Sequence, residues 1–542
     1  MGGVSGGRDT WPVPNDATWW REGVLYQIYV RSFADSDGDG IGDLQGVIDH
    51  LDHLEWLGVD GIWLSPITPS PDRDWGYDVS GYRDVHPELG DLATLDRLIA
   101  DAASRGIRVI LDLVPNHTSD AHPWFVDARS SRDAEHRGWY VWRDPRPDGS
   151  PPNNWLSVFG GQAWELDEPT GQYYLHNFLV EQPDLDWWNE DVRREFEEIL
   201  RFWFDRGIAG FRIDVANGLI KDRELRDNPP ATDDDPEDVR RRGQRQLHNM
   251  NRPEVHEIYR DWRGVADASD PPRVLVGETW IFDLGEVARF YGETGDELNL
   301  CFNFPFVFAD LDAEALRGIV GATEDALGPF AQPAWAGSNH DVGRFPTRWC
   351  ADRPDAARCA LLMVLMLRGT PFLYFGDEIG MVEVPVPRDD VRDPAGELGT
   401  QPGRDPGRTP MQWNAGPGAG FSREGVRPWL PIGDARANNV EDQRWDPGSV
   451  LRLCRDLIAL RRETSDLRSG AYSSLPSPPG AWSWRRGPST IVAVNLSDGR
   501  VAVPVGPGTI AIGTDRSRDG ETFDEDLSLG PWEGAVLRVA PA

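Results

Sequence analysis

Acidic, basic and imidazole side chains stand directly after short apolar runs at four places in the chain. The four segments are Asp112-Leu-Val-Pro-Asn-His117, Arg212-Ile-Asp214, Gly277-Glu-Thr-Trp280 and Asn339-His-Asp341. A single carboxylate of this kind is best explained as a structural group with a satisfied partner. Four such segments are harder to explain in that way, because burying an unpaired charge is costly. The spacing therefore predicts a polar site that several strand ends assemble together.

A second group of carboxylates lies in the stretch Asp35-Ser-Asp-Gly-Asp-Gly-Ile-Gly-Asp43. Candidate cation ligands stand at positions 1, 3, 5, 7 and 9 of the EF-hand spacing: Asp35, Asp37, Asp39, the backbone of Ile41, and Asp43. Position 12 is Gly46, so the bidentate glutamate of an EF-hand is missing and a calcium sensor is excluded. Two interpretations stay open: a loop that binds a structural cation, or a turn in which Asp43 caps the following helix.

The elements that must position the strand-end residues follow one alternation through most of the chain. Eight β-rich runs alternate with helical patterns such as 44–57, 94–104 and 191–205. The runs are 24–30, 61–64, 108–114, 210–215, 274–277, 298–302, 334–336 and 371–375. Strands that alternate with helices are typical of a parallel sheet, and this pattern favours an α/β fold of the (β/α)8 TIM-barrel type. In such a barrel, the C-terminal ends of the strands meet at one mouth.

Three segments depart from this alternation. Residues 117–188 are rich in Trp, Pro, Gly and Asn and are too long for a loop, so they predict a small inserted domain after the third strand. Residues 382–447 form a second irregular insert, after the eighth strand. From 471 to 542, short β-branched runs separated by Gly and Pro predict an antiparallel β-sandwich domain. The barrel itself is expected over residues 18–116 and 189–470.

Composition and charge exclude several kinds of partner. The net charge of −35 argues against nucleic acid, whose phosphates must be neutralised by clustered Lys and Arg. Most of the 24 tryptophans are expected in cores, but aromatic clefts beside carboxylates also suit sugar rings. We see no secretory signal, and the longest apolar run, 359–367, is too short to span a bilayer. The four cysteines form no CxxC pair, so we expect reduced thiols in a cytoplasmic protein without a membrane partner.

As an ordered set, these segments resemble glycoside hydrolase family 13, the α-amylase superfamily. Two further segments, 58–66 (GVDGIWLSP) and 369–378 (GTPFLYFGDE), are similar to the second- and eighth-strand regions of that family. The resemblance covers roughly residues 20–470. It implies cleavage of a glycosidic bond with retention, by double displacement. It also implies that Asp214 is the nucleophile, Glu278 the general acid and base, and Asp341 the carboxylate that assists the transition state.

These roles demand different charge states of the two working carboxyl groups. Arg212 stands two residues before Asp214, on the same side of its strand, and we expect its guanidinium to keep the nucleophile ionised. Glu278 must instead hold a proton near neutral pH, which needs a pKa raised by burial or by neighbouring negative charge. In retaining enzymes the two carboxyl groups lie about 5–5.5 Å apart.

Two segments, Asp74-Trp-Gly-Tyr-Asp78 and Gln182-Pro-Asp-Leu-Asp-Trp187, resemble the α-glucosidase and oligo-1,6-glucosidase branch of the family. The resemblance implies that a terminal, non-reducing glucose is bound by Asp74, Tyr77, His117, Phe178, Arg212, His340 and Arg404, with Arg408 as the alternative to Arg404. One end of the cleft is closed in this branch, which implies exo action on short oligosaccharides. The branch also has a similar loop after its first strand that binds Ca²⁺ or Mg²⁺, so the resemblance favours a structural cation at 35–43.

Linkage preference and reaction outcome stay open. In this branch a valine after the nucleophile, here Val215, tends to accompany α-1,6 preference, but the segment 211–222 looks closer to α-glucosidases of actinobacterial type, which favours α-1,4. A transglucosylase or a sucrose isomerase would share the same glucosyl-enzyme. A non-catalytic glycan-binding relative is disfavoured because all three acids are retained. The sequence does not indicate an oligomeric state.

Overall fold

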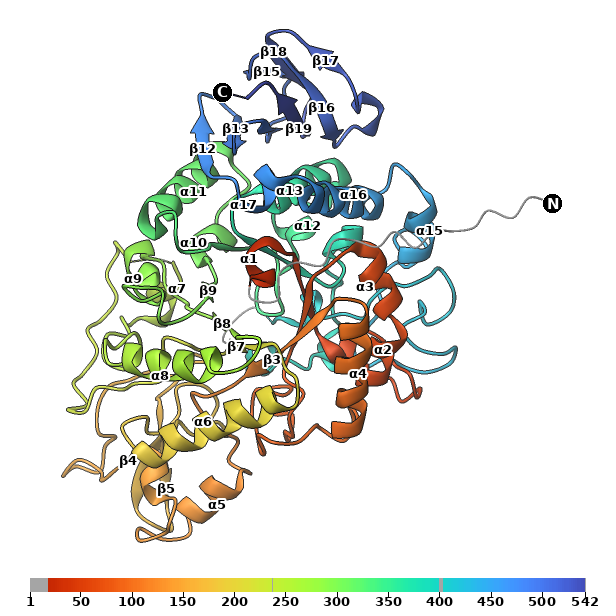
Figure 1. The fold of residues 1–542 in the computed structure, drawn as a ribbon. Coiled ribbons are helices and arrows are strands. Elements are labelled where there is room, and N and C mark those ends of the chain that lie inside the picture. Colours follow the sequence, from red (N-terminus) through yellow and green to blue (C-terminus); the bar gives the residue numbers. More distant parts are fainter. Residues whose placement is uncertain (1–17, 236, 399–402, 542) are drawn as a thin grey trace.

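The computed structural model describes residues 18–235, 237–398 and 403–541 (Figure 1). At its centre lies an eight-stranded sheet with the strand order β10-β11-β1-β2-β3-β7-β8-β9, in which neighbours pair in parallel. A parallel bridge between Phe302 and Ala334 joins its two edges and closes the barrel. The strands are β1 (Leu25–Ile28), β2 (Gly61–Leu64), β3 (Arg108–Leu113), β7 (Gly210–Ile213), β8 (Val274–Gly277), β9 (Leu300–Cys301), β10 (Ala334–Ala336) and β11 (Thr370–Tyr374). The barrel predicted from the alternation is thus confirmed.

Helices surround this sheet. They include α2 (Leu44–Asp49), α3 (Leu51–Leu57), α4 (Leu92–Ser104), α6 (Glu190–Asp205), α8 (Val255–Asp267), α11 (Ala313–Leu327), α13 (Pro354–Met366) and α16 (Val450–Glu463). Helix α6 shows the local reason, because the Asn189 side chain caps its first turn and buried residues recur at helical spacing. The helix expected over 44–57 is instead two helices that meet at His50. There the backbone leaves the helical conformation and the imidazole contacts the carbonyl oxygen of Gly46.

Inward-facing side chains form an apolar lower part of the barrel and a polar upper layer. Because side chains alternate along a strand, Leu25 and Gln27 of β1 lie on one side, as do Ile110 and Asp112 of β3. Leu25 and Ile110 belong to the apolar cluster inside the barrel. In the register between β3 and β7, Asp112 lies opposite Arg212. The alternation therefore places charged residues at the C-terminal ends of strands whose lower parts are apolar.

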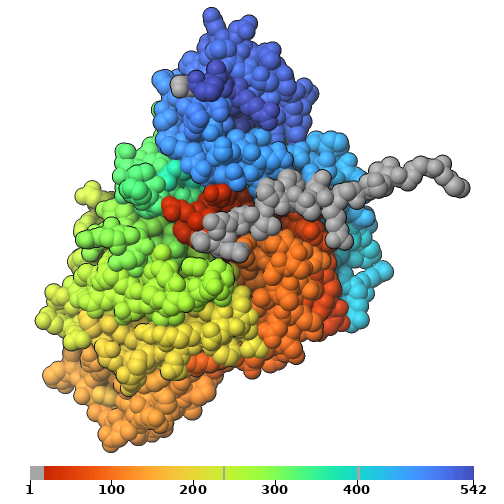
Figure 2. All heavy atoms as spheres, in the orientation of Figure 1, coloured from red at the N-terminus to blue at the C-terminus, as the bar shows by residue number. Residues whose placement is uncertain are grey.

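The segment between β3 and α6 contains a small antiparallel sheet and helix α5 (Pro123–Ala128). Strands β4 (Trp142–Arg143), β5 (Trp164–Asp167) and β6 (Gln172–Leu175) pair in the order β4-β6-β5. A separate apolar cluster lies beneath them, formed by Val141, Trp155, Ala163, Trp164 and Leu175. An antiparallel bridge between His117 and Asp184 joins the two ends of the segment. In Figure 2 this segment (orange, at the bottom) lies at the opposite end of the molecule from the C-terminal domain (dark blue, at the top).

The C-terminal domain is antiparallel, as predicted. A six-stranded sheet has the order β12-β13-β14-β19-β16-β17, and a two-stranded sheet pairs β15 with β18. The strands are β12 (Tyr472–Leu475), β13 (Ala481–Arg486), β14 (Thr490–Asn495), β15 (Val501–Pro504), β16 (Gly508–Gly513), β17 (Thr522–Phe523), β18 (Asp526–Leu529) and β19 (Gly534–Val539). One apolar cluster contains residues of both sheets, which makes the domain a sandwich. The other face of the larger sheet packs against α13 of the barrel.

Within the described ranges, no helix is both long and apolar enough to cross a bilayer. Most of the apolar run at 359–367 lies in α13, which is buried between the barrel and the C-terminal sheet. The four cysteines are buried and unpaired. After β11, the chain forms short helical turns, among them α14 (Pro394–Leu398), the 3₁₀ turn η5 (Asp405–Gly407) and α15 (Val440–Trp445). This segment also reaches the mouth of the barrel.

Candidate active site

The guanidinium of Arg212 binds three carboxyl groups at the mouth of the barrel. Its Nη1 donates to Asp112 Oδ1 at 2.9 Å and to Asp214 Oδ1 at 2.7 Å. Its Nη2 lies 2.9 Å from Glu278 Oε1. Trp63 lies under the cation, with 5.1 Å from the guanidinium carbon to its ring. The side chain of Arg212 is only 2% exposed, so these ion pairs form in a site largely screened from water.

Glu278 is also held by the backbone of the turn that follows the neighbouring strand β7. The N–H of Val215 donates to Glu278 Oε2 at 2.8 Å. Val215 has a φ of 45°, which is rare for a β-branched residue and costs backbone strain. The strained turn after β7 therefore directs a backbone donor toward the carboxyl group that ends β8.

Burial raises the pKa of both working carboxyl groups. The pKa of Asp214 rises to about 7 because burial outweighs the attraction of Arg212. Burial raises the pKa of Glu278 further, to about 8, and the charges of Asp214 and Asp341 add to the rise while Arg212 opposes it. The expectation that Arg212 keeps Asp214 ionised is therefore met only in part, because burial outweighs the ion pair. Asp214 still has the lower pKa of the two. As pH rises, Asp214 therefore ionises first while Glu278 keeps its proton, as a nucleophile and a general acid require.

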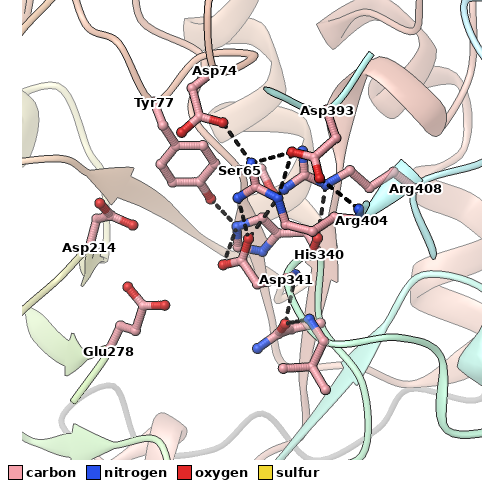
Figure 3. Close-up of polar contacts among 12 residues, drawn as sticks. Ser65, Asp74, Tyr77, Asp214, Glu278, His340, Asp341, Asp393, Arg404 and Arg408 are labelled. Atoms are coloured by element: carbon pink, nitrogen blue, oxygen red, sulfur yellow. Dashed lines mark hydrogen bonds and ion pairs between the residues drawn. The ribbon is translucent and has the colours of Figure 1, made fainter. Parts of the chain in front are cut away.

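Asp341 has the opposite electrostatic character. Burial by itself would raise its pKa, but His340, Arg404 and Arg408 hold the pKa below its usual range. Arg404 Nη1 donates to Asp341 Oδ1 at 2.9 Å and Arg408 Nη2 donates to the same atom at 3.2 Å. Figure 3 shows Asp341 across from the carboxyl groups of Asp214 and Glu278, all three directed toward the same region. The three strand ends thus bring together the three acids singled out from the sequence.

Arg404 connects the two sides of this region. Its Nη2 donates to Asp74 Oδ1 at 2.8 Å, while its Nη1 binds Asp341 (Figure 3). The Nε–H of Arg404 donates to Asp393 Oδ1 at 2.9 Å, which holds the guanidinium in place. Arg408 Nε donates to the carbonyl oxygen of His340 at 2.8 Å. Both arginines considered from the sequence therefore belong to the site: Arg404 connects Asp74 to Asp341, and Arg408 supports the loop after β10.

The other predicted sugar contacts lie around the same region. The phenol of Tyr77 donates to Asp112 Oδ2 at 3.1 Å and also contacts His340 Nε2. His117 Nε2 lies 3.1 Å from the carbonyl oxygen of Tyr77, and burial lowers the pKa of His117 to about 4. Phe178 is half-buried, with its ring centroid 5.1 Å from that of His117. The structure thus gathers every predicted substrate residue at the mouth of the barrel.

The acidic loop before α2 brings together three of its five predicted ligands. A carboxylate oxygen from each of Asp35, Asp37 and Asp39 lies within 4.8 Å of the other two. Burial raises the pKa of Asp39, and the charges of Asp37 and Asp35 add to that rise. Carboxylate oxygens gathered in this way fit a hard divalent cation, which prefers oxygen ligands.

The two remaining residues of the predicted set are engaged differently. Asp43 Oδ1 accepts the N–H of Gly46 at 2.7 Å at the start of α2, and its Oδ2 accepts the N–H of Ser36 at 2.9 Å. Ile41 donates its N–H to Asp39 Oδ1 at 2.8 Å, which closes the loop. Asp43 therefore caps α2, while the cation-ligand set of Asp35, Asp37, Asp39, Ile41 and Asp43 stays a prediction.

Several residues of the site were not assigned roles from the sequence. Asp112 lies near the end of the third strand, and its contact with Arg212 identifies it as a structural partner of that residue. Asp393 stands in the irregular segment after β11, where no spacing pattern distinguishes it. Gln27 lies inside β1, and only its 2.8 Å contact with His340 Nδ1 places it near the site.

Comparison with known proteins agrees with this geometry. The sequence profile described as "Alpha amylase, catalytic domain" matches residues 27–470. A probable α-glucosidase of Rhizobium meliloti (strain 1021) is 44% identical over 479 residues, covering 84% of each chain. An oligo-1,6-glucosidase of Heyndrickxia coagulans is 38% identical over 528 residues, covering 89% of this chain and 93% of that protein. The crystal structure of the α-glucosyl transfer enzyme XgtA has a TM-score of 0.89 and 40% identity, covering 96% of this chain and 99% of XgtA.

The fold and the site define a glycoside hydrolase built on a (β/α)8 barrel. The chain belongs to the α-amylase family, glycoside hydrolase family 13, and its relatives include α-glucosidases and oligo-1,6-glucosidases.

Proposed function

We propose that the protein is a retaining, exo-acting α-glucosidase that releases terminal, non-reducing glucose from short α-linked oligosaccharides. The observation that carries the proposal is the contact of one guanidinium, that of Arg212, with both Asp214 and Glu278. This shared partner keeps the two carboxyl groups close together, as the short separation in retaining enzymes requires. The names of the relatives support the same class of substrate.

The contacts assign separate atoms to the first step. Arg212 occupies Asp214 Oδ1, so Oδ2 is the oxygen that attacks the anomeric carbon. As the glycosidic C–O bond breaks, Glu278 transfers its proton to the leaving oxygen. In the second step Glu278 takes a proton from water, the water oxygen bonds to the anomeric carbon, and the bond to Asp214 breaks. Asp341, whose pKa is held low, supplies negative charge beside the oxocarbenium-like transition state.

The network of Asp74, Arg404 and Asp341 supports exo action. Its carboxylate and guanidinium groups fit the hydroxyl groups of a single terminal glucose. The ion pairs of Arg404 hold these groups in place before substrate arrives. We favour α-1,4 linkages such as that of maltose, from the resemblance of segment 211–222.

The acidic loop supports a structural Ca²⁺ or Mg²⁺ ion. Asp35, Asp37 and Asp39 would hold it, and it would stabilise the loop without taking part in bond cleavage. Buried, unpaired cysteines support a reducing compartment such as the cytoplasm.

The test is a substrate panel of maltose, isomaltose, sucrose, trehalose and starch, with glucose and longer products both measured. We expect glucose of α configuration from maltose, faster than from isomaltose, and negligible attack on starch. Initial products of β configuration, or endo cleavage of starch, would contradict the proposal. Faster hydrolysis of isomaltose would instead identify an α-1,6-specific enzyme.

A second candidate function is glucosyl transfer. It is favoured by the similarity to XgtA, which is an α-glucosyl transfer enzyme. Hydrolysis and transfer share the glucosyl-enzyme and differ only in whether water or a sugar hydroxyl accepts the glucose. Longer oligosaccharides from concentrated maltose, or isomers from concentrated sucrose, would identify a transferase or a sucrose isomerase.

A further inference from the structure

The imidazole of His340 lies between two kinds of neighbours. On one side, Nε2 lies 3.1 Å from Asp341 Oδ2 and contacts the hydroxyl oxygen of Tyr77. On the other side, Nδ1 lies 2.8 Å from the side-chain nitrogen of Gln27. His340 and Gln27 are each 1% exposed, so water does not compete for these contacts.

The carboxylate of Asp341 can only accept a hydrogen bond, and the Tyr77 hydroxyl has an acceptor for its own proton in Asp112 Oδ2 at 3.1 Å. A lone pair on Nε2 would face the lone pairs of the Asp341 carboxylate at 3.1 Å. The proton of a neutral imidazole must lie on Nε2, which leaves Nδ1 as the acceptor.

Gln27 supplies the donor that this tautomer requires. One N–H of its amide is directed to His340 Nδ1, and the other has an acceptor in Ser65 Oγ at 3.3 Å. The opposite orientation of the amide would place its oxygen against a lone pair on Nδ1. In this orientation both N–H groups of Gln27 have acceptors, and one of them is His340 Nδ1.

We propose that Gln27, oriented by Ser65, is a positioning residue that holds His340 as the neutral Nε2–H tautomer directed at Asp341. This inference rests on the proposed function, in which His340 and Asp341 act on the terminal glucose. Gln27 does not touch the sugar; it acts through the ring of His340. Without its donor, the Nδ1–H tautomer competes, and a lone pair on Nε2 then repels the Asp341 carboxylate.

Other charged and titratable groups around the ring agree with a neutral imidazole. Arg212, Arg404 and Arg408 disfavour a second proton, whereas Asp341 favours one. Burial is the largest influence, and it lowers the pKa of His340 well below its ordinary value. The remaining titratable neighbours, Tyr29 and Tyr77, stack on the ring, with centroid distances of 6.1 and 5.2 Å.

The first experiment compares Gln27→Met with the surface control Gln45→Met. Methionine has nearly the length of glutamine but no N–H, so the donor is lost while the volume is kept. We expect kcat on maltose to fall roughly tenfold to hundredfold, as for one buried unsatisfied polar group, with a smaller change in KM. Ser65→Ala should give a smaller loss of the same kind, and Gln45→Met none. Wild-type kcat and KM in folded Gln27→Met would overturn the inference.

The second experiment reads the tautomer directly in the wild-type protein. Nitrogen-15 spectra of histidine-labelled enzyme, with the His340→Asn variant to assign the ring, should show a protonated Nε2 and an unprotonated Nδ1. A proton on Nδ1, or a doubly protonated ring at pH 7, would overturn the inference even if Gln27→Met does not fold. The two proposals fail separately, because a wild-type protein without glucosidase activity contradicts the proposed function, while the ring spectrum still tests the role of Gln27.

Discussion

The guanidinium of Arg212 lies 2.9 Å from the carboxyl group of Glu278, and burial nevertheless raises the pKa of Glu278 to about 8. The neighbouring Asp214 has a pKa of about 7. The arginine stabilises the charged form of both acids, but the loss of solvation that comes with their burial outweighs this effect. A single residue thus holds the pair in place without making both acids fully ionised at neutral pH.

The pH dependence of kcat/KM should follow these two groups. Activity requires ionised Asp214, so it should rise as pH increases through about 7, and protonated Glu278, so it should fall as pH increases through about 8. We expect a bell-shaped profile with its maximum between these values, and the two apparent pKa values belong to the coupled pair. Initial rates on maltose below its KM check this. A maximum below pH 5 would contradict these charge states.

Replacement of the two working acids should have different consequences. Asp214→Asn should abolish turnover of every substrate, because no glucosyl-enzyme can form, while circular dichroism shows an intact fold. Glu278→Gln should lower kcat/KM on maltose by roughly 10²–10⁴-fold, but should lower kcat/KM much less on a glucoside whose leaving group needs no proton, because kcat/KM reports the first step alone. Substantial turnover by a pure Asp214→Asn preparation would exclude its role as nucleophile.

Arg404 should contribute through its geometry as well as its charge. Arg404→Lys keeps a positive charge but cannot span Asp74 and Asp341 with one planar group. We expect kcat/KM for maltose to fall by roughly tenfold or more, because one or two buried hydrogen bonds to charged groups are lost. Arg427→Lys is the matched control, since that residue is 80% exposed and pairs with Asp390 at the surface. Equal activities of the two variants would show that Arg404 does not organise the site.

The acidic loop should bind a divalent cation that stabilises the fold. Addition of Ca²⁺ or Mg²⁺ to chelator-treated protein should raise Tm by a few degrees, because a ligand that binds only the folded state stabilises it. The Asp37→Asn/Asp39→Asn variant should lose this rise. Its kcat should match that of the wild type, because the ion takes no part in catalysis. If neither ion changed Tm, the cation site would be excluded, and the acidic loop would be only a turn in which Asp43 caps α2.

Lys221 should be important for stability. It is the single lysine of the chain, and its Nζ lies 2.7 Å from Asp184 Oδ2 and donates to Asn116 Oδ1 at 2.7 Å. Lys221→Met should lower the free energy of unfolding by about 3–5 kcal/mol, because Asp184 would keep a buried charge without a cation. In a thermal or denaturant titration, Lys221→Met/Asp184→Asn should lose less than the sum of the single changes. Strict additivity would show that the two groups do not interact.

The sequence by itself determined the barrel and the three acids. Alternation of apolar runs with helical patterns is a local property, and each acid directly follows such a run, so the closure of a parallel barrel places Asp214, Glu278 and Asp341 at one mouth. The segment after β11 has no such periodicity. Asp393 and the joint role of Arg404 and Arg408 were therefore visible only once that segment was placed against β10.

Tertiary structure alone decided the electrostatics and the supporting contacts. Arg212 and Asp214 are two residues apart, so the alternation of side chains along the strand predicts their contact. Burial depends on the whole surroundings of the pair, and it raises the pKa of Asp214 although the contact with Arg212 lowers it. Gln27 and His340 are 313 residues apart, and no sequence spacing connects them. Asp43 fits a cation-ligand spacing in the sequence, and the tertiary structure adds that its carboxylate accepts the backbone N–H of Gly46 in the first turn of α2.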